Sequence, residues 1–235
     1  MNVAVVRFPG SNCDLDVVAA LQATEGIKPK LVWHEKSNLR GFDALVLPGG
    51  FSFGDYLRAG AIAARSPSIA EIKRLAEEGV PVLGICNGFQ ILVEAGLLPG
   101  SLLRNSGLRF VCKWVTLRVE NNTTPFTHRS ERGELLRIPI AHNEGRIFLP
   151  EDDLKALKKA GRIVFRYTDE MGEVSASGNP NGSQESIAGI CNEDRNVLGM
   201  MPHPERAVNP VLNSEGRSDG MAIFSSLAGL TRRGN

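Results

Sequence analysis

The stretch Val80-Pro-Val-Leu-Gly-Ile-Cys-Asn-Gly-Phe-Gln-Ile-Leu92 indicates how this chain folds around its chemistry. A short apolar run precedes Cys86, and a segment with the apolar spacing of a helix follows it at once. Gly84 and Gly88 stand two residues on either side of the cysteine. Strand, tight turn and helix in this order form a nucleophile elbow, with cysteine in the place of serine. We expect the turn to be so tight that a side chain at either glycine would strike the flanking strand or helix.

This geometry also favours a reactive thiol at Cys86. The positive end of the following helix favours the thiolate, which is the nucleophilic form. The amide of Asn87 is then placed to donate to a tetrahedral oxyanion. The alternative is a buried packing role, which is the commonest one for cysteine and is expected here for Cys13, Cys112 and Cys191. The four cysteines form no CxxC pair and show no zinc-finger spacing with histidine, so neither a metal site nor a disulfide framework is predicted.

A base for this thiol is offered by the run Gly199-Met-Met-Pro-His-Pro-Glu-Arg-Ala207, which follows a predicted strand. Prolines on both sides of His203 are expected to forbid a helix and to hold the backbone extended. In an extended chain, residues two apart point to the same side, so Glu205 is expected to reach one ring nitrogen while the other faces the cleft. This is the base and its orienting carboxylate in a catalytic triad. His34 and His128 lack such a context and are expected to be structural.

Consecutive glycines follow another predicted strand in Ala44-Leu-Val-Leu-Pro-Gly-Gly50. Backbone amides can approach a ligand closely at such glycines, so Gly50 or a neighbour is a candidate for the second oxyanion donor. A plain tight turn is the alternative. The chain contains neither GxxxxGK[ST] nor GxGxxG, so it carries no recognisable site of its own for ATP or a dinucleotide.

The wider pattern predicts an α/β fold, with a mostly parallel sheet covered by helices on both faces. Region 100–150 is expected to be a β-rich elaboration, residues 1–230 to form one domain, and the tail 231–235 to be frayed. The predicted strands are Val3–Phe8, Lys30–Trp33, Ala44–Leu47, Val80–Ile85, Phe110–Val119, Arg162–Tyr167, Ile187–Ile190 and Val197–Met200. The predicted helices are Asp14–Thr24, Ser68–Glu78 and Phe89–Ala95.

Composition excludes several classes of protein. The 235 residues include 27 Lys and Arg against 26 Asp and Glu, a net charge of +1, which argues against nucleic acid or an acidic membrane as the partner. No basic leader and no apolar run of membrane-spanning length is present, so a cytoplasmic protein is expected.

Three motifs in chain order resemble the class I glutamine amidotransferases: Pro48-Gly49-Gly50, the elbow at Cys86, and His203-Pro-Glu205. The resemblance implies a glutaminase in which Cys86 attacks the side-chain amide of glutamine. His203 would pass a proton to the leaving ammonia, Glu205 would hold the imidazole, and water would release glutamate from a thioester. Further runs that carry the resemblance are Arg7–Asp14, Pro48–Arg58, Gly96–Gly100, Ile140–Gly145, Asn179–Ser183 and Met200–Arg206.

The resemblance also implies how the site and its partners are arranged. Gly49, Gly50, Asn87, Gly88 and Gln90 would bind glutamine or its oxyanion. The chain itself would need no cofactor or metal. Its ammonia would pass to a separate synthetase subunit that uses ATP and magnesium, with a small bridging subunit in the same complex.

One further histidine, His142, has three possible roles: it could line the cleft, meet the synthetase or bond a loop carbonyl. Two other functions for the whole chain stay open from the residues alone. A stand-alone cysteine peptidase or esterase would use the same elbow without a partner. A non-catalytic binding or stress protein of related fold would need no His203-Pro-Glu205.

Overall fold

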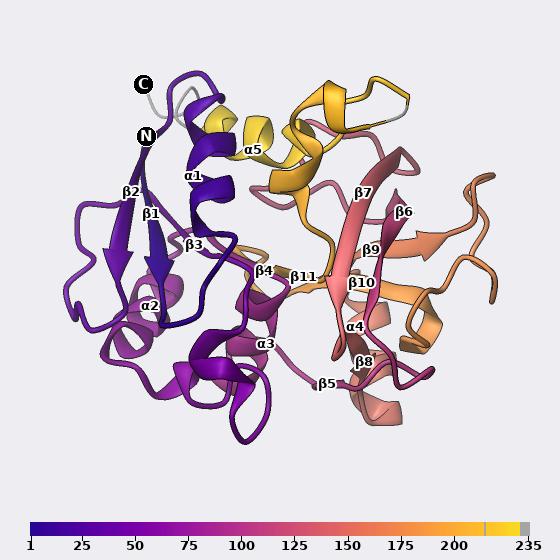
Figure 1. The fold of residues 1–235 in the computed structure, drawn as a ribbon, viewed down its shortest axis with the longest axis horizontal. Coiled ribbons are helices and arrows are strands. Elements are labelled where there is room, and N and C mark those ends of the chain that lie inside the picture. Colours follow the sequence, from indigo (N-terminus) through magenta and orange to yellow (C-terminus); the bar gives the residue numbers. More distant parts are fainter. Residues whose placement is uncertain (214, 231–235) are drawn as a thin grey trace.

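Strand β4 (Val82–Ile85), which leads into Cys86, lies inside a nine-stranded sheet (Figure 1). Its neighbours are β3 (Ala44–Leu47) and β11 (Val197–Met200), both parallel to it. All three strands are buried along their whole length, as expected of parallel strands covered on both faces. This computed structural model describes residues 1–213 and 215–230, so the tail expected to be frayed lies outside the described residues.

The sheet has a parallel half and an antiparallel half. Its other strands are β1 (Asn2–Arg7), β2 (Lys28–Trp33), β6 (Val111–Val119), β7 (Leu135–His142), β9 (Ile163–Thr168) and β10 (Ile187–Cys191). The order is β2-β1-β3-β4-β11-β10-β9-β6-β7, parallel as far as β11 and antiparallel beyond it. Strands β5 (Ser101–Leu103) and β8 (Arg146–Phe148) pair separately. The expected β-rich region is therefore confirmed.

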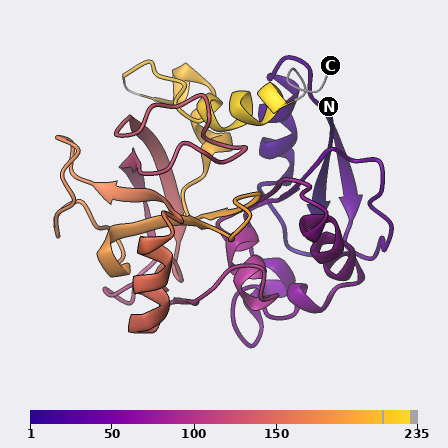
Figure 2. The same ribbon diagram turned by 180° about the vertical axis from the view of Figure 1, so that it is seen from behind.

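Helices cover both sides of the sheet, as predicted. Helices α1 (Asp14–Gln22) and α5 (Met221–Ala228) lie together on one side, and α2 (Pro67–Glu77) and α3 (Asn87–Glu94) lie on the other (Figures 1 and 2). Helix α4 (Glu151–Lys159) lies beside the antiparallel half. Short 3₁₀ helices are η1 (Ser52–Asp55), η2 (Ala63–Arg65), η3 (Gln184–Ser186), η4 (Pro204–Ala207) and η5 (Pro210–Leu212). No helix within the described ranges is both long and apolar enough to cross a bilayer.

Among the elements that the sequence did not predict are two helices and a long strand. Helix α4 has few apolar residues, although its acidic first turn and basic last turn complement the helix dipole and were an available signal. Helix α5 is apolar on most of its surface and shows little helical periodicity. Strand β7 contains Pro139, which an interior strand would not tolerate; the residue fits because β7 is an edge strand.

The parallel strands bring the sequence motifs together. Parallel strands end on the same edge of a sheet, and ligands of α/β proteins bind outside these carboxyl ends. Pro48-Gly49-Gly50 follows β3, Cys86 follows β4, and His203 follows β11. The topology therefore gathers residues more than 150 positions apart at one edge.

Close packing at this edge depends on Gly88. A methyl group there would lie 2.0 Å from the carbonyl oxygen of Leu47 in β3. We predict that Gly88→Ala lowers the free energy of unfolding by about 3 kcal/mol or more, because neither backbone can yield cheaply. Gly107→Ala is the matched control, since its added methyl meets no atom within 4 Å, and it should change stability by less than about 0.5 kcal/mol. Urea unfolding of both variants measures the difference; equal midpoints would contradict the proposed packing constraint.

Candidate active site

Cys86 sits in a strained turn between β4 and α3. Its backbone has φ 50° and ψ −104°, a left-handed value that few residues other than glycine adopt, and only 4% of its surface is exposed. A methyl at Gly84 would lie 2.7 Å from the carbonyl oxygen of Gly88, so the flanking glycines let the turn close. The strand, turn and helix predicted from the sequence are all present. The thiol therefore lies at the N-terminus of α3.

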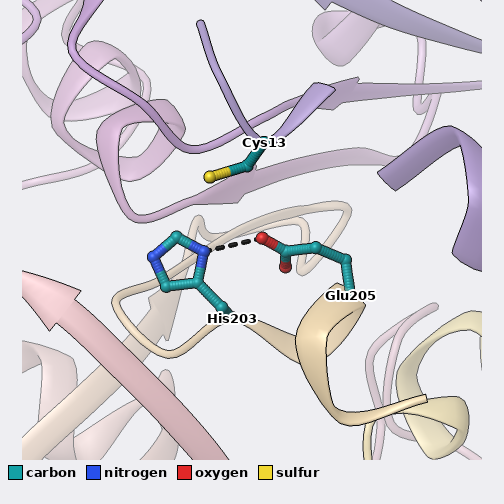
Figure 3. A group of neighbouring side chains, drawn as sticks. All are labelled: Cys13, His203 and Glu205. Carbon is teal, nitrogen blue, oxygen red and sulfur yellow. Dashed lines mark hydrogen bonds and ion pairs between the residues drawn. The ribbon is translucent and has the colours of Figure 1, made fainter. Parts of the chain in front are cut away.

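His203 and Glu205 form a buried pair beside this turn. Nδ1 of His203 lies 2.6 Å from Oε1 of Glu205, and the two side chains are 2% and 0% exposed (Figure 3). The backbone of His203 is anchored to β7, because its N–H donates to the carbonyl of Pro139 at 2.8 Å. Nε2 makes no hydrogen bond within the described residues, which leaves it available to a reacting group.

The expected extended backbone after His203 is wrong. Residues Pro204–Ala207 form the 3₁₀ helix η4, with proline at its first position. Proline suits that position because its φ matches a helix and its missing N–H would have no helical partner. The contact with Glu205 still forms, from the first turn of this helix rather than from a strand.

The charge on the imidazole is set by its neighbours. Burial lowers the pKa of His203, but the negative charges of Glu205 and then Cys86 more than offset this and raise that pKa well above 6.5. Cys86 thus lies near enough for a thiolate and an imidazolium to stabilise each other. This arrangement combines a nucleophile with a proton donor.

Asn87 and Gln90 tie α3 to two loops. The Asn87 side chain accepts a hydrogen bond from the amide of Ser52 at 3.1 Å and donates one to Oε1 of Gln90 at 2.9 Å. Gln90 in turn donates to the carbonyl of Glu144 at 2.6 Å. The amides of Asn87 and Gly88 lie in the first turn of α3, where N–H groups have no partner inside the helix.

The paired glycines lie where other segments approach closely. A methyl at Gly49 would lie 2.6 Å from Cε1 of His203, so this glycine makes room for the imidazole. Gly50 has φ 144°, and its backbone bridges to Ser11 in the loop before α1. Gly50 also lines the cavity beside Cys86.

That cavity has a volume of about 250 Å³, below the range of about 300–1,000 Å³ that is typical of drug-sized ligands. Its lining is mostly polar, and the residues are Gly50, Phe51, Asp55, Cys86, Gln90, Arg104, Ala141, His142, Asn143 and Glu144. Burial, with a contribution from the charge of Glu144, raises the pKa of Asp55 to about 6. Arg104 Nε lies 3.7 Å from Oε1 of Glu144. Asp55, Arg104 and Glu144 were not singled out from the sequence, although Asp55 and Glu144 lie within the runs that carry the resemblance.

His142 lines the same cavity. Its Nδ1 lies 3.0 Å from Oδ1 of Asn105, an oxygen that also accepts the amide of Gly145. Burial, with a smaller effect of the charge on His203, lowers the pKa of His142 to about 4. A neutral ring with Nδ1–H donating to Asn105 leaves Nε2 as an acceptor, and that atom is buried without a hydrogen bond in the described residues.

Of the three remaining cysteines, only Cys191 simply has the packing role expected for them. Cys191 belongs to the hydrophobic core, and burial raises the pKa of its thiol to about 11, as suits a packing residue. Cys112 is exposed, so the prediction is wrong there. Cys13 is buried, but its sulfur points toward the imidazole of His203 and accepts a hydrogen bond from Nη2 of Arg206 at 3.1 Å (Figure 3). His34 bonds Oγ of Ser66 at 3.0 Å, as expected of a structural histidine.

Comparison with known proteins places the chain in a family. Residues 1–228 match the CobB/CobQ-like glutamine amidotransferase domain. The phosphoribosylformylglycinamidine synthase subunit PurQ of Thermus thermophilus is 56% identical over 227 residues, which cover 97% of each protein. The chain belongs to this amidotransferase family. The resemblance predicted from the motifs is thus confirmed. The runs Phe51–Arg58 and His142–Gly145 indicate a narrower branch of the family, the glutaminase subunit of phosphoribosylformylglycinamidine synthase. The identity to the Thermus thermophilus subunit confirms this branch as well.

Solved structures agree with the amidotransferase fold. A chain in the structure of PurLQS from Thermotoga maritima superposes with a TM-score of 0.85 at 46% identity, covering 98% of both chains. A glutamine amidotransferase of the same organism shares the fold alone, with a TM-score of 0.61 at 16% identity over 99% of this chain and 97% of that one. The predicted α/β class is therefore confirmed.

Removing the charge of Glu205 tests the buried pair. Because this charge raises the pKa of His203, Glu205→Gln should lower that pKa. The protonated imidazole exists below its pKa and is lost as the pH rises through it, so the alkaline limb of glutaminase activity should move to lower pH. We expect kcat to fall by at least about 100-fold, within the range of general acid–base catalysis. Glu170→Gln, an exposed site, is the control; an unmoved alkaline limb in Glu205→Gln would contradict the assignment.

Proposed function

We propose that this chain is the glutaminase subunit of phosphoribosylformylglycinamidine synthase. The observation that carries the proposal is that Cys86, which lines the polar cavity, lies next to the buried His203–Glu205 pair. The ammonia it releases would serve an ATP-dependent synthetase subunit that makes formylglycinamidine ribonucleotide in purine biosynthesis. The relatives named PurQ support this substrate and pathway.

The proposed reaction begins with attack of the Cys86 thiolate on the side-chain amide carbon of glutamine. The amides of Asn87 and Gly50 would donate to the oxyanion that forms. The imidazolium of His203 would give its proton to the amide nitrogen, the C–N bond would break and ammonia would leave. Water, deprotonated by the now neutral His203, would then hydrolyse the thioester to glutamate and restore the thiolate–imidazolium pair.

The cavity's charged residues support recognition of an amino acid. The α-ammonium group of glutamine would lie against the carboxylates of Asp55 and Glu144, and its α-carboxylate against Arg104. Gln90 would hold the loop that contains Glu144 in place by donating a hydrogen bond to the Glu144 carbonyl. His142, neutral in this site, would accept a hydrogen bond through Nε2. The site needs no metal for this chemistry.

A partner is required because ammonia that reaches neutral water becomes mostly protonated and is no longer nucleophilic. We propose that residues 1–230 form one amidotransferase domain of a cytoplasmic complex with a synthetase subunit and a small bridging subunit. The solved structure described as PurLQS supports such an assembly. ATP and magnesium would bind to the synthetase partner.

The raised pKa of Asp55 predicts that activity is lost at low pH. Its pKa of about 6 means that the carboxylate is present above this pH and lost below it, so kcat/KM should fall as the pH drops through about 6. In Asp55→Asn we expect this limb to disappear and kcat/KM at pH 8 to be about tenfold lower, the cost of one charge-assisted hydrogen bond. Glu77→Gln, exposed at the end of α2, should leave the profile unchanged. An acid limb that persists in Asp55→Asn would contradict this role.

Labelling with a glutamine-mimicking electrophile tests the function as a whole. We expect covalent attachment at Cys86, detected by peptide mass spectrometry and blocked by excess glutamine. Cys86→Ala should take up no label, whereas Cys112→Ala, which removes an exposed thiol, should label as the wild type does. Labelling that glutamine does not slow would favour a general cysteine hydrolase.

The same preparations test the coupling to a partner. Glutamine hydrolysis by the chain alone should be weak and should rise when the synthetase and bridging subunits are added. Full turnover of the isolated chain would contradict the coupling.

A further inference from the structure

Three possible metal-donor atoms of different chemistry lie close together at the Nδ1 side of the His203 imidazole. The sulfur of Cys13, a ring nitrogen of His203 and a carboxylate oxygen of Glu205 all lie within 4.8 Å of one another. Cys13 precedes α1, whereas the other two follow β11, and Figure 3 shows the sulfur on the side of the ring that carries Nδ1. All three residues are buried, with exposed fractions of 2%, 2% and 4% in chain order.

Thiolate, imidazole and carboxylate are the three ligand types that zinc takes in proteins. Zinc–ligand bonds of about 2.0–2.3 Å in a tetrahedron place the donor atoms about 3.5 Å apart. Nδ1 of His203 and Oε1 of Glu205 lie 2.6 Å apart, so these two atoms would have to separate by about 1 Å to bind one ion. The sulfur of Cys13, which lies within 4.8 Å of both side chains, would have to approach them by up to about 1 Å. The sequence predicted no such site, because Cys13 lies 190 positions before His203 and the spacing carries no motif.

An unpaired carboxylate oxygen in this cluster supports a site for a cation. Oε2 of Glu205 is buried without a hydrogen bond in the described part of the chain, and an unsatisfied buried carboxylate oxygen is costly. Arg206 donates to the sulfur of Cys13 at 3.1 Å. The thiol itself donates to Oδ1 of Asn12 at 3.3 Å, and this proton would leave on ligation. Arg206 also pairs with Asp16 at 3.5 Å, and this carboxylate offsets its charge beside the site.

We propose that Cys13, His203 and Glu205 form an inhibitory binding site for Zn²⁺. The ion takes the place of the proton between Nδ1 of His203 and Glu205, with the Cys13 thiolate as third ligand and Oε2 of Glu205 or water as fourth. Nε2, the ring nitrogen left for Cys86, then carries the remaining proton of a neutral imidazole. The ring can no longer accept a proton at Nε2, so zinc removes the catalytic base while leaving the nucleophile in place.

Cobalt binding tests the ligand set without any need for activity. In Cys86→Ser, where Cys13 is the only thiol left at the site, Co²⁺ should give a thiolate-to-cobalt charge-transfer absorption. The band should be lost in Cys86→Ser/Cys13→Ser and kept in Cys86→Ser/Cys112→Ser, whose missing thiol is exposed on β6. A band that survives without Cys13, or is absent while Cys13 is present, overturns the proposal. Circular dichroism of each variant checks that the fold is retained.

Zinc inhibition of glutamine hydrolysis is the second measurement, and only this arm rests on the proposed function. Each variant's inhibition is expressed relative to its own metal-free rate. Cys13→Ser should raise the zinc concentration for half-inhibition by more than about 10-fold, since even the loss of an outer-shell partner costs 10–100-fold in metal affinity. Cys112→Ser should leave it unchanged. Equal inhibition of wild type and Cys13→Ser would place the metal on Cys86 instead and overturn the proposal.

Discussion

The close approach of α3 to β3 is the constraint on which the site depends. The backbone of Gly88 nearly touches that of Leu47, so the helix begins directly at the end of the sheet. This contact leaves no room for a relaxed connection, and Cys86 takes up the strain in its left-handed backbone. Two glycines and the buried strands around them maintain the strained backbone of Cys86, because strained conformations persist only where the surrounding structure enforces them. A thiol on a fixed turn at a helix N-terminus is the result.

Beside this thiol, the pKa values of two buried histidines are shifted in opposite directions. His203 faces the carboxylate of Glu205 and the sulfur of Cys86, which outweigh burial and keep it protonated. His142 has no such anion among the groups that set its pKa, and the charge on His203 adds to the effect of burial, so it is neutral. Environments that push two similar groups apart assign them different roles, one as proton donor and one as acceptor. The two shifts are linked, because the charge that Glu205 stabilises on His203 helps to keep His142 neutral.

Sequence patterns predicted the parallel half of the fold better than the rest. Strands buried on both faces are continuous apolar runs, and Ala44–Leu47 and Val197–Met200 were predicted to the residue. The antiparallel edge strand β7 was missed because its proline is acceptable only at an edge, a property of the sheet rather than of the strand. The backbone after His203 was mistaken for extended because the φ of proline suits both a strand-like chain and the first position of a helix.

The sequence by itself determined the local chemistry: the elbow at Cys86, the carboxylate within two residues of His203, and the family that these motifs indicate. Each of these lies within a few residues of chain, where spacing dictates geometry. Only the tertiary structure decided which distant groups join them. The sheet brings Cys13 beside His203, and it gathers the acids and the arginine of the cavity from separate loops. No periodicity connects such residues, because they come close only when segments far apart in the chain pack together.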